Sequence, residues 1–110
     1  MNVFAKKEVF SQPIDSLSVT KGQVLFTQNC TSCHQIKTDG IGPKLSGITS
    51  LTSPTWVKRF IKNSQDLIAA GDERATQVFL KYKKAIMPSY SHLQETEIDA
   101  IVDYLATTKP

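Results

Sequence analysis

One short motif, Cys30-Thr31-Ser32-Cys33-His34, constrains the fold of this chain more than any other feature. Residues three apart on a helix share a face, so the two thiols can reach one flat partner on that side. His34 follows the second cysteine directly and can ligate a metal held by the same partner. The spacing is typical of a c-type haem attachment site, with thioethers from Cys30 and Cys33 and His34 Nε2 as the proximal iron ligand.

Other uses of a Cys-x-x-Cys pair remain open from the residues alone. A redox dithiol of the thioredoxin kind needs a nearby βαβ pattern, and no strand pattern is recognisable in the sequence. A zinc site needs four ligands, and only His34 and the distant His92 could complete one with the two cysteines. A simple disulfide between Cys30 and Cys33 is the third alternative. We interpret the motif as a haem attachment site.

The motifs and their order resemble those of class I cytochromes c, bacterial electron carriers or carrier domains with one haem. The resemblance covers about Val19 to Thr107. It rests on the haem motif, on Gly42-Pro43, on Met87-Pro88 and on a last helix with Tyr104-Leu105. It implies an all-α fold, with about four helices wrapped round one covalently attached haem c and the first and last helices crossed. It also implies electron transfer between redox partners, as the iron cycles between Fe(II) and Fe(III).

Met87 is the predicted second axial ligand. Pro88 restricts Met87 to an extended backbone, so the direction of the Met87 side chain is restricted as well. A thioether is a soft ligand that favours ferrous haem and raises the reduction potential. The other methionine in the chain is Met1, far from this segment in the sequence. Met87 as a filler of the core and His92 as the competing ligand are the alternatives.

Pro43 and Trp56 receive roles from the resemblance. A ligating histidine usually donates its second ring nitrogen to a carbonyl, and in the family the proline of the Gly-Pro pair supplies it. Pro43 is therefore expected to orient His34. In similar cytochromes a tryptophan at the position of Trp56 points at a haem propionate, with Arg59 as a second candidate. The alternatives are a plain turn at Gly42-Pro43 and a core position for Trp56.

Four helices are predicted from caps and apolar spacing. The first starts near Thr20 as N-cap. The resemblance implies that its Gly22 and Phe26 cross the last helix at Tyr104. The other predicted helix starts are Ser53-Pro54, Asp72 and Gln94, the last with Glu97 as the back half of a capping box.

With 110 residues, the chain is predicted to form one cytochrome c domain at 19–110, after an N-terminal arm or linker at 1–18. A formal charge of +3 gives no support for nucleic acid as a partner.

We expect a monomer that exchanges electrons with a redox protein donor and acceptor. The lysines in segments that could border the exposed haem edge are Lys37, Lys44, Lys83 and Lys84.

No apolar stretch approaches the roughly 18 residues that span a membrane, and Met1-Asn2-Val3-Phe4 does not open a signal peptide. Because c-type haem is usually attached after export, we expect a periplasmic location or the outer face of the cytoplasmic membrane. A signal or membrane tether would then lie outside this chain.

We expect an electron carrier rather than an enzyme, since ligation by His34 and Met87 leaves no open iron site for a substrate. One alternative is an electron-entry cytochrome c domain of a larger multidomain oxidase or reductase. A second alternative is a gas-binding sensor in which Met87 is labile.

Overall fold

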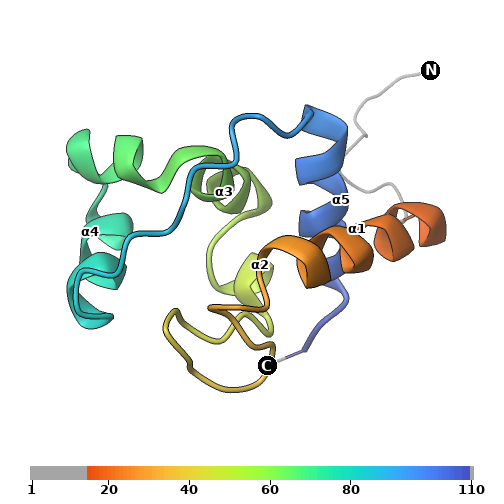
Figure 1. The fold of residues 1–110 in the computed structure, drawn as a ribbon, viewed down its shortest axis with the longest axis horizontal. Helices are drawn as coiled ribbons and strands as arrows, with labels where there is room; N and C mark the ends of the chain where they lie inside the picture. The colour runs from red at the N-terminus through yellow and green to blue at the C-terminus, as the bar shows by residue number, and fades with distance from the viewer. Residues whose placement is uncertain (1–14, 110) are drawn as a thin grey trace.

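The computed structural model describes residues 15–109, and these form five helices and no strand. The helices are α1 (Ser16–Asn29), α2 (Ile48–Leu51), α3 (Pro54–Ala69), α4 (Glu73–Lys81) and α5 (Glu95–Ala106). Figure 1 shows α1 and α5 at one end of the molecule and α4 at the other, with α3 between them. The predicted all-α fold is confirmed, with α2 as a single additional turn.

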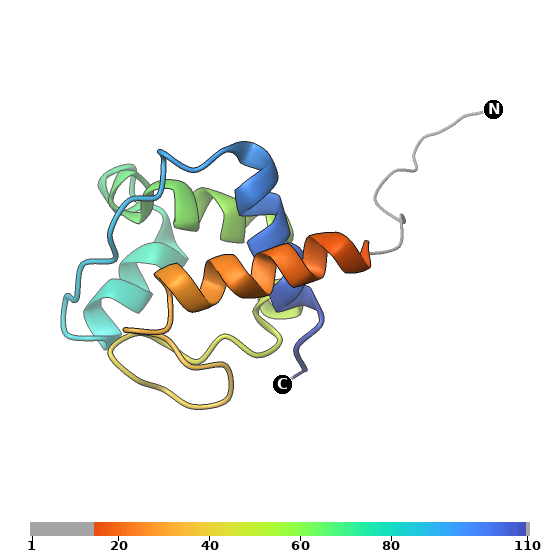
Figure 2. The same cartoon turned by 45° about the vertical axis from the view of Figure 1, so that its right-hand side comes forward.

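The first and last helices cross in close contact, as predicted (Figures 1 and 2). A Cβ atom on Gly22 would lie 1.9 Å from the carbonyl oxygen of Ala100, so only glycine allows this approach of the two backbones. One turn later, the rings of Phe26 and Tyr104 lie 5.5 Å apart between their centroids. This crossing holds the end of α1, and therefore the cysteine motif, in a fixed position.

The predicted start of α1 at Thr20 is wrong. The helix begins at Ser16, because the side chain of Asp15 caps it and accepts the N–H of Leu17 at 3.1 Å. The hydroxyl of Ser18 also donates to Asp103 on α5 at 2.7 Å, which ties the first turn to the last helix. The last residues of the predicted arm therefore belong to α1, while residues 1–14 lie outside the described part of the chain.

The other three helices begin as their caps predict. Each start is held by a side chain that accepts a backbone N–H of the first turn or of the cap. The bonds are Trp56 N–H to Ser53 at 3.1 Å, Ala75 N–H to Asp72 at 2.9 Å and Gln94 N–H to Glu97 at 2.8 Å. Within α3, Asn63 has a non-helical backbone, and its side chain accepts the N–H of Asp66 at 3.3 Å, which caps the second half.

The buried core lies where α1, α3 and α5 meet. Its members include Phe26, Val57, Ile61, Ile98, Ile101, Val102 and Leu105. Two surface ion pairs, Lys58–Asp99 at 2.9 Å and Lys62–Glu95 at 2.7 Å, join α3 to α5. Exposed pairs of this kind contribute about 0–1 kcal/mol each, so burial of apolar side chains is the main stabilising term.

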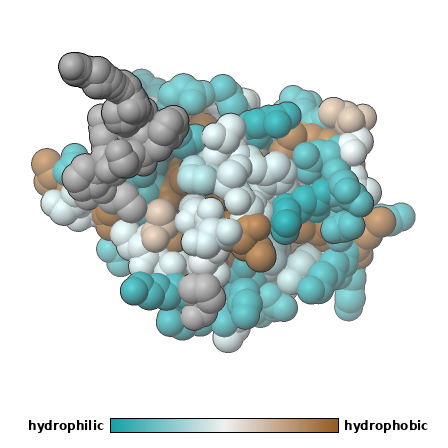
Figure 3. Space-filling view, turned by 180° about the vertical axis from the view of Figure 1, so that it is seen from behind, coloured by the Kyte–Doolittle hydropathy of each residue, from teal (hydrophilic) through white to brown (hydrophobic). Residues whose placement is uncertain are grey.

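No membrane-spanning helix is found in the part of the chain that the structure describes. None of its helices is both long and apolar enough to cross a bilayer. Seen from behind, the apolar residues form several separated groups among polar ones (Figure 3).

Candidate functional site

The cysteine motif forms one tight turn at the end of α1. Cys30 caps the helix through its N–H to the carbonyl of Phe26 at 2.8 Å, and His34 N–H donates to the carbonyl of Cys30 at 2.9 Å. Both cysteines are free thiols. Burial raises the pKa of the Cys30 thiol to about 11, and the nearby Cys33 adds to the rise. The turn brings Cys30, Cys33 and His34 to the wall of one cavity.

That cavity has two adjoining parts, both lined by Cys30, His34, Phe60 and Met87 among others. The larger part, called the inner cavity below, is lined by side chains of α2, α3, α4 and α5 and has a volume of about 560 Å³. The outer pocket, beside the cysteines, has a volume of about 90 Å³. Pockets that hold small molecules and cofactors measure roughly 300–1,000 Å³, so the inner cavity has the size of a cofactor site.

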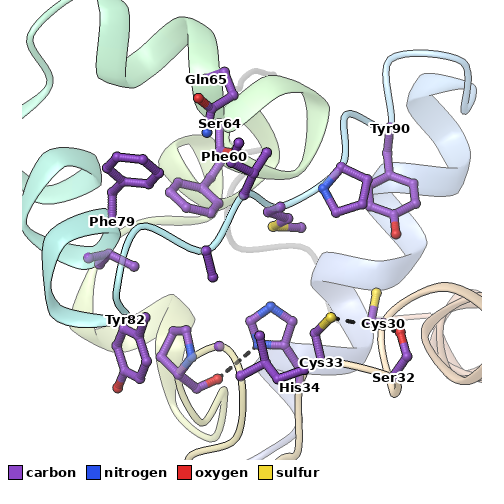
Figure 4. A pocket seen from close by; sticks show the side chains of 18 of the residues that line it. Cys30, Ser32, Cys33, His34, Phe60, Ser64, Gln65, Phe79, Tyr82 and Tyr90 are labelled. Carbon is purple, nitrogen blue, oxygen red and sulfur yellow. Dashed lines mark hydrogen bonds between the residues drawn. The ribbon is translucent and has the colours of Figure 1, made fainter.

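His34 is held in a single orientation at the cavity wall. Its side chain is only 9 % exposed, and its Nδ1 lies 2.9 Å from the carbonyl oxygen of Pro43, to which it donates (Figure 4). A Cβ atom on Gly42 would lie 2.4 Å from His34 Cε1, so the glycine makes room for the ring. The structure thus brings Pro43 to His34, and Nε2 is the ring nitrogen left to bind a metal.

Gly42→Ala is expected to displace the His34 ring and to lower the free energy of unfolding of the holoprotein by about 1–3 kcal/mol. The cause is the added methyl group, which must overlap the imidazole. Denaturant unfolding measures the loss, and Ile41→Ala, at the exposed neighbouring residue, is the control. Equal stability of the two variants would contradict the tight contact.

Met87 lies in the irregular segment after α4, half-buried, and lines both parts of the cavity. Left-handed backbone at Lys83 and Lys84, with φ of 61° and 60°, turns the chain after α4 towards the cavity. The N–H of Lys84 donates to the carbonyl of Phe79 at 2.7 Å, in the pattern of a Schellman cap. Glycine usually occupies such a position, which is why the sequence does not predict this turn.

His92, the competing ligand, is exposed and lines neither part of the cavity. Its ring lies 5.9 Å from that of Tyr90. Nor does it join the cysteines in a zinc site: among residues 15–109, no group of three or more His, Cys, Asp or Glu side chains could hold a metal ion. Met87 is therefore the candidate ligand that the fold places in the same cavity as His34.

Trp56 lines the inner cavity, but its indole N–H has a protein partner. It donates to the carboxylate of Asp72, the N-cap of α4, at 3.1 Å. The N–H of Ala75 is the main cause that holds the pKa of Asp72 below its usual value, and the Trp56 bond lowers it further. The propionate contact of Trp56 stays a prediction, and Asp72 was not expected from the sequence to be a competing acceptor.

Two further side chains at the cavity wall, Asp39 and Tyr82, have no predicted role in the site. The carboxylate of Asp39 accepts the N–H of Lys44 at 3.0 Å, and this bond is the main cause that lowers its pKa. Burial raises the pKa of Tyr82, and interaction with Asp39 raises it further. Asp39 comes from the loop after the motif and Tyr82 from the end of α4, and both line the inner cavity.

Tyr90 is a third residue that the sequence does not single out. Its hydroxyl donates to the carbonyl oxygen of Asn29 at 2.8 Å, and its backbone N–H donates to the carbonyl oxygen of Ile61 at 3.3 Å. These bonds attach the segment after Met87 to the end of α1 and to α3. Its position three residues after Met87 is the only signal that could have indicated this role.

Comparison with protein-family models decides the relationship: the model for cytochrome c matches residues 19–109. This chain belongs to the cytochrome c family. The cytochrome resembles the solved structure of cytochrome c from Rhodothermus marinus with a TM-score of 0.80 and 27% identity, over 91% of this chain and 84% of that one.

Two other similar proteins are domains or subunits. The cytochrome c domain of the pp3183 protein from Pseudomonas putida has a TM-score of 0.68 and 31% identity, over 76% of this chain and 83% of that one. The CcoP subunit of the cbb3-type cytochrome c oxidase of Rhodobacter capsulatus is 28% identical over 107 residues. That match covers 89% of this chain and 32% of the subunit, so the cytochrome spans about a third of this relative.

The cofactor is one covalent haem c, and the function is electron transfer by this haem. The residues present fit the group, because two cysteine sulfurs that are not joined in a disulfide, an oriented imidazole and a thioether line one pocket. Gly42 has no side chain, and a Cβ atom there would overlap the imidazole, so the glycine lets His34 keep the orientation that a ligand needs.

Proposed function

We propose that Cys30 and Cys33 form the thioether bonds to the haem and that His34 and Met87 are its two axial ligands. The observation that carries this proposal is that His34 and Met87 line one cavity beside both cysteines. When bound, the haem supplies a Fe(II)/Fe(III) couple whose potential a sulfur ligand raises. Pro43 orients the imidazole, and the surrounding apolar side chains exclude water. The variants of Cys30, Cys33 and Met87 considered below test these assignments.

With both axial positions filled by protein, the cytochrome transfers electrons without binding a substrate at iron. We place the exit at the outer pocket, because Cys33, which is partly exposed and would hold one haem edge, lines this pocket and not the inner cavity. Ile41 and Ile86 line this pocket and are 61 % and 68 % exposed. They provide an apolar centre for a docking surface.

Lys83 and Lys84 precede this apolar centre and are exposed. Their left-handed backbone costs roughly 1–2 kcal/mol per non-glycine residue, and glycine would avoid that cost. Lysines at both positions therefore favour a role for their charge. We assign them to the recognition of a redox partner with an acidic surface, while Lys37 and Lys44 remain candidates for the same role.

Lys83→Glu combined with Lys84→Glu is expected to lower the bimolecular rate of electron transfer to an acidic acceptor protein by about tenfold at low salt. The rate of the unaltered cytochrome should fall as ionic strength rises, because salt screens the attraction beyond about 8 Å at 0.15 M. Stopped-flow measurement over a range of ionic strength checks both effects.

The matched control replaces Lys21 and Lys109, exposed lysines that line neither part of the cavity, by glutamate. The control should retain most of the rate. A flat salt profile that Lys83→Glu and Lys84→Glu leave unchanged would exclude steering by these lysines.

A second candidate role is that of an electron-entry domain in a larger oxidase or reductase. The match to about a third of a CcoP oxidase subunit favours it. A domain tethered near its partner needs no steering, so the flat salt profile is the result that this role predicts. In that case the catalytic chemistry belongs to other parts of the assembly, and the cytochrome itself remains a carrier.

We further propose a location on the periplasmic side, either free or held to the membrane by a segment or partner outside this chain. The family supports it, since haem c is usually attached after export. Haem staining of periplasmic, membrane and cytoplasmic fractions tests it, and a covalent haem band confined to the cytoplasm would contradict it.

A further inference from the structure

The two ends of the cavity differ in charge. Among the described residues that line the outer pocket, none is Lys, Arg, Asp or Glu. The inner cavity is lined by three cations, Lys44, Arg74 and Lys81, and by one carboxylate, that of Asp39. Three positive charges against one negative leave a net charge of +2 around the inner cavity. An anionic group is therefore favoured at this end.

The cysteines fix which edge of the haem reaches which end. Figure 4 shows Cys30 and Cys33 at one end of the pocket and Phe79 and Tyr82 of the α4 region at the other, with His34 between them. Thioethers form on the vinyl groups at one edge of the macrocycle, and the two propionates leave the opposite edge. With the vinyl edge held by the cysteines, the propionates must point towards the α4 region.

Three polar side chains of α4 line the inner cavity on this side. Arg74, Gln77 and Lys81 stand at i, i+3 and i+7, so they share one face of the helix. All three are exposed and line the inner cavity, so their polar ends remain near water. A guanidinium can bind a carboxylate through two parallel hydrogen bonds, and an ammonium acts as a compact charge.

We propose that Arg74 and Lys81, with Gln77 between them, bind the haem propionates. The proposal rests on the covalent haem and the axial ligands assigned above. It gives Trp56 a different role from the one that the family resemblance implies. Trp56 has a single N–H, which Asp72 already accepts at 3.1 Å, so it holds the start of α4 rather than a propionate.

The charged and titratable groups around the propionates come from two elements. The loop after the motif contributes Asp39 and Lys44, and α4 with its cap contributes Arg74, Lys81 and Tyr82. Asp39 opposes binding, but its carboxylate is partly occupied by the N–H of Lys44. Asp72, the N-cap of α4, and Arg59 of α3 lie nearby, yet neither lines the cavity.

The test is the midpoint reduction potential as a function of pH, measured on the holoprotein. Loss of a propionate proton stabilises Fe(III), so the potential falls as pH rises through the propionate pKa. Cations within about 4–6 Å lower that pKa, so Arg74→Gln combined with Lys81→Gln should move the inflection to higher pH by about one unit. Each single variant should move it by less, which covers the case of a double variant that folds poorly.

Two controls separate this from the alternatives. Arg59→Gln removes one positive charge outside the cavity and should leave the inflection in place. Trp56→Phe removes the indole N–H that holds the start of α4, so it should move the inflection less than the Arg74 and Lys81 variants do. The proposal would be overturned if either control shifted the inflection as much as the Arg74 and Lys81 variants do. An unchanged inflection in the Arg74 and Lys81 variants would also overturn it. The visible spectrum of each variant reports haem attachment and sulfur ligation separately, so failure of those assignments would be recognised independently.

Discussion

Replacing both Cys30 and Cys33 by alanine should leave a chain that retains no haem after extraction with acidified organic solvent. The unaltered protein should keep its haem, because thioether bonds survive that treatment. The double variant should also lose most of its stable structure. An inner cavity of about 560 Å³ left empty in a domain of this size removes much of the packing of the core.

Ser32→Ala is the matched control, since Ser32 lies between the cysteines and lines the outer pocket. It should retain the haem fully. Each single cysteine variant should keep one thioether and an intermediate yield of holoprotein. Full haem retention after extraction of the double variant would exclude the thioether assignment.

Met87→Ala should abolish the weak far-red absorption band that a sulfur-to-iron bond gives in the oxidised protein. It should also lower the reduction potential by on the order of 0.1 V, within the roughly 0.8 V range that axial ligands control. The physical reason is that the thioether stabilises ferrous iron, and alanine leaves that position to water or to a harder ligand. Redox titration followed by absorbance measures both effects in one experiment.

His92→Ala is the control for this variant, because His92 is exposed and outside the cavity. It should leave the band and the potential unchanged. A far-red band that persists in Met87→Ala, or disappears in His92→Ala, would show that the sixth ligand is another group.

Local rules of sequence were sufficient for most of the fold. Ser53, Asp72 and Gln94 start helices as predicted, because each cap depends on residues within one turn. The crossing of α1 and α5 was also predictable. Gly22 suggested close approach of another backbone, and the resemblance to class I cytochromes c implied that Gly22 and Phe26 meet the last helix, as they do.

Features that depend on long-range contacts or on unusual backbone were not predictable. The bond from Trp56 to Asp72 joins residues 16 apart in the sequence, and it depends on how the kink at Asn63 and the turn after α3 fold the chain back. The left-handed backbone at Lys83 and Lys84 occurs where glycine would be expected. The start of α1 was missed for a different reason: Asp15 and Thr20 are both acceptable caps, and packing of Ser18 on Asp103 favours the earlier one.

The visible absorption spectrum of the purified holoprotein, recorded oxidised and then reduced, tests the central claim most directly. Covalent haem c ligated by His34 and Met87 predicts the sharp, split bands of low-spin ferrous haem after reduction. It also predicts a weak far-red sulfur-to-iron band after oxidation, with both states recovered reversibly. A broad, high-spin spectrum in the reduced state, or one without the far-red band when oxidised, would contradict an electron carrier with both axial positions filled.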